Sequence, residues 1–200
     1  MAEVKLEKKQ EKIKRRITKE LIYEMRKGSP IYYRDYDKVL SGEKSLEEVM
    51  GSGGLQSLLL TVLVSFLYEK IKDRYFILSG EIGYKIGSKS WYNLDIAVIS
   101  KERLKTIPQG YIEIPPDIVI EIDTKADLRK FLNPQDYFHR KTQDLLDCGV
   151  KKVIWIFTKE RKVWVAEKGK PWIITDWNDI IEVMDNITLN LYAIFQEKIS

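Results

Sequence analysis

Seven residues decide the fold: Asp117-Ile118-Val119-Ile120-Glu121-Ile122-Asp123. In a β-strand, successive side chains point to opposite faces, so the three isoleucines share one face of this strand. The other face carries three acids around Val119. We expect the isoleucine face to join the core. Burying the carboxylates on the other face would be costly without a cation, and a divalent-metal site is one way to compensate them.

A second buried acid lies upstream, in a strand predicted over residues 91–99. Asp95 stands between two apolar residues, in a segment too apolar to be a solvated edge, so its carboxylate needs a partner. The loop over residues 100–116 contains turn-forming residues and is long enough to let the two strands pair. Asp95 and Glu121 would then lie on neighbouring strands, within reach of one ion.

A helix is predicted over residues 134–147, with Asn133 as its N-cap. Lys141 shares one face of that helix with Phe138 and Leu145, where a core-facing helix would ordinarily carry an apolar residue. A surface helix can also bury the stem of a lysine and leave its ammonium group in water. Beside two half-buried acids, a lysine directed at those acids is the favoured interpretation.

Two strand acids and a nearby lysine resemble the active site of the PD-(D/E)XK nuclease superfamily. More narrowly, the chain is similar to a restriction endonuclease family within it in three features: the run Pro116-Asp117-Ile118-Val119-Ile120-Glu121, Lys141 ahead of Gly149-Val150, and the aromatic strand Val153-Ile154-Trp155-Ile156. The same family often has a segment like Met50-Gly51-Ser52-Gly53-Gly54-Leu55-Gln56 before a long helix. The resemblance covers roughly residues 30–195 and implies a restriction endonuclease-like fold.

The resemblance also implies a metal-dependent chemistry. Asp95, Glu121 and the backbone carbonyl of Ile122 would hold Mg²⁺ or Mn²⁺ through oxygen ligands. Lys141 would hold or deprotonate the attacking water and offset charge in the transition state. Asp117, which follows two prolines, is more typical of a turn-stabilising residue than of a ligand.

The sequence departs from the superfamily pattern at Asp123, where the usual motif has a lysine. Lys141 would replace that lysine, and Lys125 is its competitor. Asp123 could bind a second ion or cap the turn at the next residue. Glu81 could add a further acid or be a solvated residue at a strand end. Gln56 could point into the site or be an ordinary glutamine of a first helical turn.

The N-terminal end of the chain is basic. Residues 1–27 contain ten Lys or Arg and five Glu, whereas the whole chain has a net charge of +4. We expect residues 1–29 to form a basic amphipathic helix, which could dock on the domain, pair with a second subunit or lie along a DNA backbone. The candidate nucleic-acid contacts are Lys12, Arg15, Arg16, Lys19 and Arg34.

Composition agrees with one further domain over residues 30–200. A hydrophobic fraction of 44% can supply a full core, and the single cysteine, Cys148, excludes an internal disulfide. The apolar stretch over residues 58–67 is shorter than a membrane span and is expected to form a buried helix. No signal peptide is visible, so we expect a cytoplasmic protein without a membrane partner.

We therefore predict an α/β fold with a mixed, mostly antiparallel central sheet. A long helix from about Leu55 should cover one face and the helix with Lys141 the other. The predicted function is a metal-dependent DNA endonuclease, acting as a homodimer so that both strands can be cut. The alternative is a module that binds nucleic acid or protein on a nuclease scaffold without cleaving, because a fold does not fix a function.

Overall fold

The computed structural model describes residues 18–184 and 186–199. A central sheet has the strand order β2-β1-β4-β5-β6-β7-β8, and β3 pairs with β4 outside that path. Its strands are β1 (Ile22–Arg26), β2 (Ser29–Tyr32), β3 (Tyr75–Gly87), β4 (Ser90–Ser100), β5 (Ile118–Ile122), β6 (Lys152–Phe157), β7 (Lys162–Glu167) and β8 (Ile173–Asp176). A separate hairpin consists of β9 (Ile181–Met184) and β10 (Ile187–Leu189). The helices are α2 (Tyr36–Ser41), α3 (Leu46–Met50), α4 (Gly54–Ile71), the 3₁₀ helix η1 (Leu128–Lys130), α5 (Pro134–Asp147) and α6 (Leu191–Ile199).

The sheet is mixed and mostly antiparallel, as predicted. Of its paired strands, β5 and β6 alone run parallel. Because β3 pairs with β4 along nearly its whole length, β1 and β5 must share the other edge of β4. Met25 of β1 faces Trp91 there, and Ile120 of β5 faces Ile96. β1 therefore approaches the end of β5, although the two are far apart in sequence.

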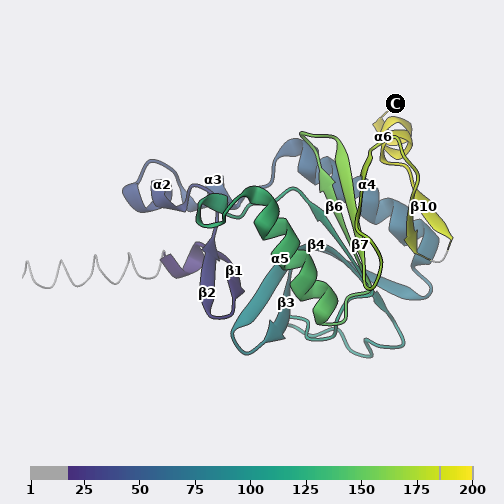
Figure 1. The fold of residues 1–200 in the computed structure, drawn as a ribbon, viewed down its shortest axis with the longest axis horizontal. Helices are drawn as coiled ribbons and strands as arrows, with labels where there is room; N and C mark the ends of the chain where they lie inside the picture. Colours follow the sequence, from purple (N-terminus) through teal and green to yellow (C-terminus); the bar gives the residue numbers. More distant parts are fainter. Residues whose placement is uncertain (1–17, 185, 200) are drawn as a thin grey trace, which may run out of the picture.

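Helices cover both faces of the sheet (Figure 1). α4 buries Leu59, Leu63 and Leu67 against the isoleucine face of β5. α5 packs Tyr137 and Leu145 into the core on the opposite face. Figure 1 shows α5 in front of the sheet and α4 behind it. The predicted placement of these two helices on opposite faces is confirmed.

The start of α5 follows from local chemistry. The side chain of Asn133 accepts a hydrogen bond from the N–H of Asp136 at 2.9 Å, and Pro134 occupies the first helical position. These signals fix the helix at the predicted bounds. The helical spacing then places Lys141 on the same face as the buried Leu145, where Lys141 is buried as well.

The N-terminal helix predicted over residues 1–29 is wrong for its last part, because residues 22–26 form β1. Lys27 and Gly28 both have positive φ, 50° and 81°, and close a two-residue hairpin between β1 and β2. Leu21 and Tyr23 are buried in the core. Strand pairing and burial thus override the four-residue spacing of Leu21 and Met25, which is typical of a helix.

The remainder of that predicted helix lies largely outside the described residues. Lys12, Arg15 and Arg16 belong to this part. Lys19 is exposed in a helical turn over residues 18–20, and Arg34 is exposed after β2. The two described candidates are therefore accessible to solvent, and their role in binding stays a prediction.

One helix among the described residues, α4, is long and apolar enough to cross a membrane by length and composition. It is longer than the apolar stretch expected from the sequence. Five of its side chains are buried within the protein. The criterion alone is weak evidence for a membrane segment.

Candidate active site

The two predicted strand acids lie side by side. Ile96 and Ile120 are register partners on the antiparallel strands β4 and β5, and Asp95 and Glu121 each lie one residue beyond them. Oδ2 of Asp95 accepts a hydrogen bond from the N–H of Ile122 at 2.7 Å. The exposed fractions of Asp95 and Glu121 are 9% and 1%. The predicted pairing of these strands is confirmed, and both carboxylates are buried.

Lys141 reaches Glu121 from α5. Its Nζ lies 3.0 Å from Oε1 of Glu121, and it donates hydrogen bonds of 2.7 Å to Oε1 of Glu24 and to the carbonyl oxygen of Asn93. The contact with Glu121 is an ion pair without hydrogen-bond geometry, and Oε1 of Glu121 has no hydrogen-bond partner among the described residues. Only 1% of Lys141 is exposed. It is a buried cation rather than a solvated surface lysine.

Glu24 is a site residue that the sequence pattern did not reveal. It lies on β1, is fully buried, and also accepts a hydrogen bond from the hydroxyl of Tyr137 at 2.9 Å. Because the sequence predicts a helix over residues 1–29, it does not reveal the strand face on which Glu24 lies. The signal that could have found it is Gly28-Ser29-Pro30, a cluster of turn-forming residues that interrupts a helical pattern.

Burial raises the pKa of the carboxyl groups of Asp95, Glu24 and Glu121. The charges of Asp95 and Glu24 raise the pKa of Glu121 further, against the opposing charge of Lys141. Burial alone would lower the pKa of Lys141, but the charges of Glu121 and Glu24 raise it above its ordinary value. Lys141 therefore stays protonated at neutral pH and compensates the acids around it.

A small cavity of about 30 Å³ opens beside Asp95. Glu81, Gln56 and Ile122 also line it. Nε2 of Gln56 donates a hydrogen bond to the carbonyl oxygen of Ile122 at 2.9 Å, so the predicted accessory glutamine and the predicted ligand carbonyl meet at this point. A cavity of this size has room for about one water molecule or one ion.

Glu81 and Lys125, both predicted as accessory residues, form an ion pair at the cavity. Lys125 also donates to the carbonyl oxygen of Met50 at 2.8 Å, and the hydroxyl of Tyr33 donates to Glu81 at 3.2 Å. Glu81 has a positive φ of 56°, where the register between β3 and β4 shifts. Such an irregularity redirects a side chain. Glu81 is therefore held at the site instead of being solvated at a strand end.

Asp123 is engaged in a turn. It has a positive φ of 55°, and its carboxylate accepts hydrogen bonds from the backbone N–H and the hydroxyl of Thr158 at 2.9 and 2.6 Å. Both oxygens therefore hold the end of β6. This fits the predicted capping alternative, with Thr158 as partner instead of Thr124.

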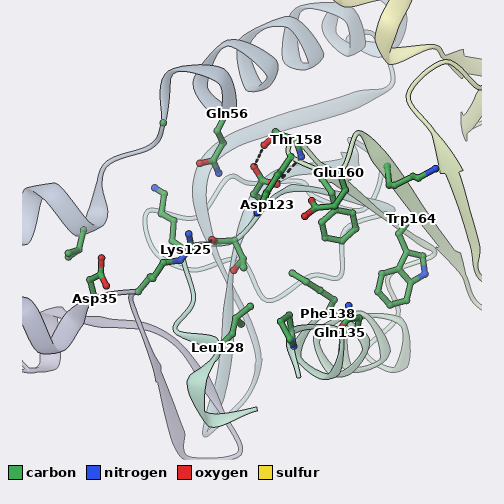
Figure 2. A pocket seen from close by; sticks show the side chains of 18 of the residues that line it. Asp35, Gln56, Asp123, Lys125, Leu128, Gln135, Phe138, Thr158, Glu160 and Trp164 are labelled. Atoms are coloured by element: carbon green, nitrogen blue, oxygen red, sulfur yellow. Dashed lines mark hydrogen bonds between the residues drawn. The ribbon is translucent and has the colours of Figure 1, made fainter. Parts of the chain in front are cut away.

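A larger cleft of about 720 Å³ lies next to the small cavity and shares Gln56 with it (Figure 2). Asp123 and Lys125 line this cleft, and Phe138 and Trp164 line the side away from Lys125 in the view of Figure 2. Arg34, a predicted nucleic-acid contact, also lines this cleft, where its Nη2 donates to the carbonyl oxygen of Thr124 at 2.6 Å.

The oxygen atoms around the small cavity suit a hard divalent cation. Asp95 and Glu81 line it with carboxylates and Ile122 lines it as well, whereas Glu121 does not line the cavity and its Oε1 lies 3.0 Å from Nζ of Lys141. Across residues 18–184 and 186–199, no three Asp, Glu, His or Cys side chains come together closely enough to hold a metal by themselves. An ion at this site would therefore need the Ile122 carbonyl and water as further ligands.

Comparison with known proteins defines the fold. No protein-family model and no curated protein sequence matches the chain. Among solved structures, the chain is similar to the crystal structure of a "putative nuclease belonging to DUF820" from Anabaena variabilis ATCC 29413. The TM-score is 0.64 at 18% sequence identity, over 86% of this chain and 89% of that chain. The protein thus has a restriction endonuclease-like α/β fold, and the resemblance predicted from the motifs is confirmed at the level of the fold.

Proposed function

We propose that the protein is a nuclease that hydrolyses DNA phosphodiester bonds with Mg²⁺ or Mn²⁺. The observation that carries this proposal is the buried ion pair of Lys141 and Glu121, next to Asp95 and its ion-sized cavity. Burying several carboxylates and one lysine beside an open cleft is costly for stability, and such groups cluster at functional sites. The fold shared with the Anabaena protein supports a nuclease-like scaffold.

In this proposal Asp95, Glu121 and the carbonyl oxygen of Ile122 hold the metal, with Glu81 as a further acid. A bound Mg²⁺ or Mn²⁺ supplies a Lewis acid that polarises a phosphoryl oxygen and lowers the pKa of a coordinated water. Gln56 keeps the Ile122 carbonyl beside the cavity through its hydrogen bond.

Lys141 acts as a fixed positive charge rather than as a general base. Its raised pKa keeps the ammonium protonated, and its burial keeps it behind Glu121. It therefore positions the Glu121 carboxylate. Lys125 lines the open cleft, where its ammonium pairs with Glu81 and donates to the carbonyl oxygen of Met50, so in this proposal it holds Glu81 at the site.

A binding module on the same scaffold is the second candidate. Two contacts favour it, because they engage two of the proposed metal ligands. Gln56 donates a hydrogen bond to the Ile122 carbonyl oxygen, and Lys141 forms an ion pair with Glu121. A module of this kind would bind nucleic acid or protein without cleaving it.

Plasmid nicking by the full chain separates the two candidates. We expect nicking with Mg²⁺ or Mn²⁺, none with EDTA, and a loss of about 100-fold or more in Asp95→Asn and Glu121→Gln. Asp73→Asn, at an exposed acid after α4, is the matched control and should keep full activity. Nicking that survives in Asp95→Asn, or failure to cleave both plasmid and single-stranded DNA with either metal, would overturn the nuclease proposal. In the second case, oligonucleotide binding without cleavage would favour the binding module.

A further inference from the structure

The row of side chains that contains Glu121 continues across the sheet as aromatic residues. Glu121 faces Trp155 on β6, Trp155 faces Trp164 on β7, and Trp164 faces Ile174 on β8. Register partners point to the same face of a sheet. This row therefore leads from the buried acids to the β8 side of the sheet.

Exposure rises along this row. Trp155 is buried, with Phe138 of α5 packed against it at a ring distance of 4.9 Å. Trp164 is half-buried, and Ile174 is 67% exposed. Beyond α5, the sheet thus presents apolar side chains to solvent. Phe138, Trp164 and Ile174, together with Phe157, line the 720 Å³ cleft.

The cleft contains few unpaired cations. Its basic residues are Arg34, Lys44, Lys125, Lys159 and Lys162. Ion pairs with Asp35, Glu81 and Asp176 already engage the lysines at 44, 125 and 162. Among the described residues, Lys159 has no acidic partner, and Arg34 bonds to a backbone carbonyl. Positive charge in the cleft is therefore largely neutralised, while its aromatic side chains Phe138, Phe157 and Trp164 are half-buried.

We infer that this cleft binds unpaired nucleotides, so that the substrate class of the proposed nuclease is single-stranded or locally unpaired DNA. Bases in a duplex are stacked on each other, whereas bases of a single strand can stack on Phe or Trp side chains. Binding to a duplex depends chiefly on phosphate neutralisation, which this cleft supplies poorly. Its volume falls within the range of about 300–1,000 Å³ of ligand sites.

The statement about the substrate of the nuclease rests on the proposed function. The binding of unpaired nucleotides in the cleft does not. Fluorescence anisotropy with the full chain in EDTA measures that binding, using labelled oligothymidylate of about 12 nucleotides and a duplex of equal length. We expect the single strand to bind more tightly. Trp164→Ala should weaken its binding roughly tenfold or more. Tyr68→Ala, at an aromatic residue on α4 that is 56% exposed and does not line the cleft, is the control.

A second measurement separates contact from folding, because Trp164 also packs against Trp172 at a ring distance of 5.6 Å. Oligothymidylate should quench the tryptophan fluorescence of the unmodified protein. Trp164→Phe should keep most of the binding and lose most of the quenching. Equal quenching in this variant would place the bases elsewhere and overturn the inference.

The outcomes distinguish this inference from the proposed function. Metal-dependent cleavage with equal or tighter binding of the duplex would sustain the nuclease and overturn the inference. Trp164-dependent binding of the single strand without cleavage would sustain the inference and overturn the nuclease. Equal weakening in Trp164→Ala and Tyr68→Ala would also overturn the inference.

Discussion

A lysine buried between two glutamates stabilises a protein only if all three charges are held in good geometry. Lys141 has contacts of 2.7 Å with Glu24 and 3.0 Å with Glu121. The helical spacing of α5 predicted the face of Lys141, because that spacing is a local property of the chain. Glu24 could not be found in the same way, since it meets Lys141 only after β1 has paired with β4. The sequence thus predicts one half of this charge cluster.

Removing the cation tests this cluster. In Lys141→Met, two buried carboxylates remain, and we expect a loss of about 3 kcal/mol in the free energy of unfolding at pH 8. Burial raises the pKa of Glu24 and Glu121 above their values in the unfolded chain. Keeping these groups ionised in the fold therefore lowers the free energy of unfolding as pH rises, and more so without the lysine. The difference between variant and unmodified protein should therefore shrink from pH 8 to pH 5. Urea denaturation at both pH values measures it, and Lys168→Met, at an exposed lysine, should change little. A loss independent of pH would contradict this account.

Asp117 has the opposite pKa shift. Burial would raise its pKa, but hydrogen bonds from Lys151 at 2.7 Å and from the N–H of Ser100 at 2.8 Å, with the charge of Arg103, hold it below its usual range. A lowered pKa contributes stability above the unfolded value of about 3.9, and this stability is lost as pH falls through the folded value. Asp117→Asn should cost roughly 1–3 kcal/mol at pH 7 and much less at pH 2, as measured by urea denaturation. An equal cost at both pH values would mean that these pairs do not stabilise the fold.

At the scale of elements, local signals and long-range pairing differ in how well sequence predicts them. The bounds of α5 follow from an N-cap and a proline, and α4 follows from a long apolar run, so both are predictable. β1 is not, because Met25 lies four residues after Leu21, a helical spacing, and the partners of β1 lie on β2 and β4. Since Glu24 belongs to β1, an error in one element removed one residue from the predicted site.

The β1–β2 hairpin should depend on Gly28. Its φ of 81° lies in the left-handed region, so Gly28→Ala should cost about 1–2 kcal/mol even though the added Cβ would meet only Lys89, at 3.6 Å. Gly110→Ala is the control, because that glycine has ordinary φ and open space around it. Thermal unfolding of both variants measures the difference. Equal stability of the two would argue against a hairpin turn at this position.

At the scale of the whole molecule, the fold class was predictable because the spacing of isoleucine and leucine residues indicates which faces of the strands and helices are buried. The two clefts could not be predicted, since they form between elements that are distant in sequence. Gln56, Glu81 and Ile122 come from α4, β3 and β5, yet line one cavity. Because three elements meet at that cavity, a metal bound there should change the stability of the whole domain.

Metal binding should therefore stabilise the entire fold. A ligand that binds only the folded state at about 100 times its dissociation constant adds about 2.7 kcal/mol, which raises the Tm of a domain this size by roughly 5–10 °C. Differential scanning calorimetry with Mn²⁺ should show such a rise for the unmodified protein and for Asp73→Asn, but not for Asp95→Asn. Burial raises the pKa of Asp95 and Glu121, so protons compete with the metal, and the rise should be larger at pH 8 than at pH 6. A rise that persists in Asp95→Asn would place the metal away from this cavity, and a rise that grows toward pH 6 would mean that these carboxylates are not its ligands.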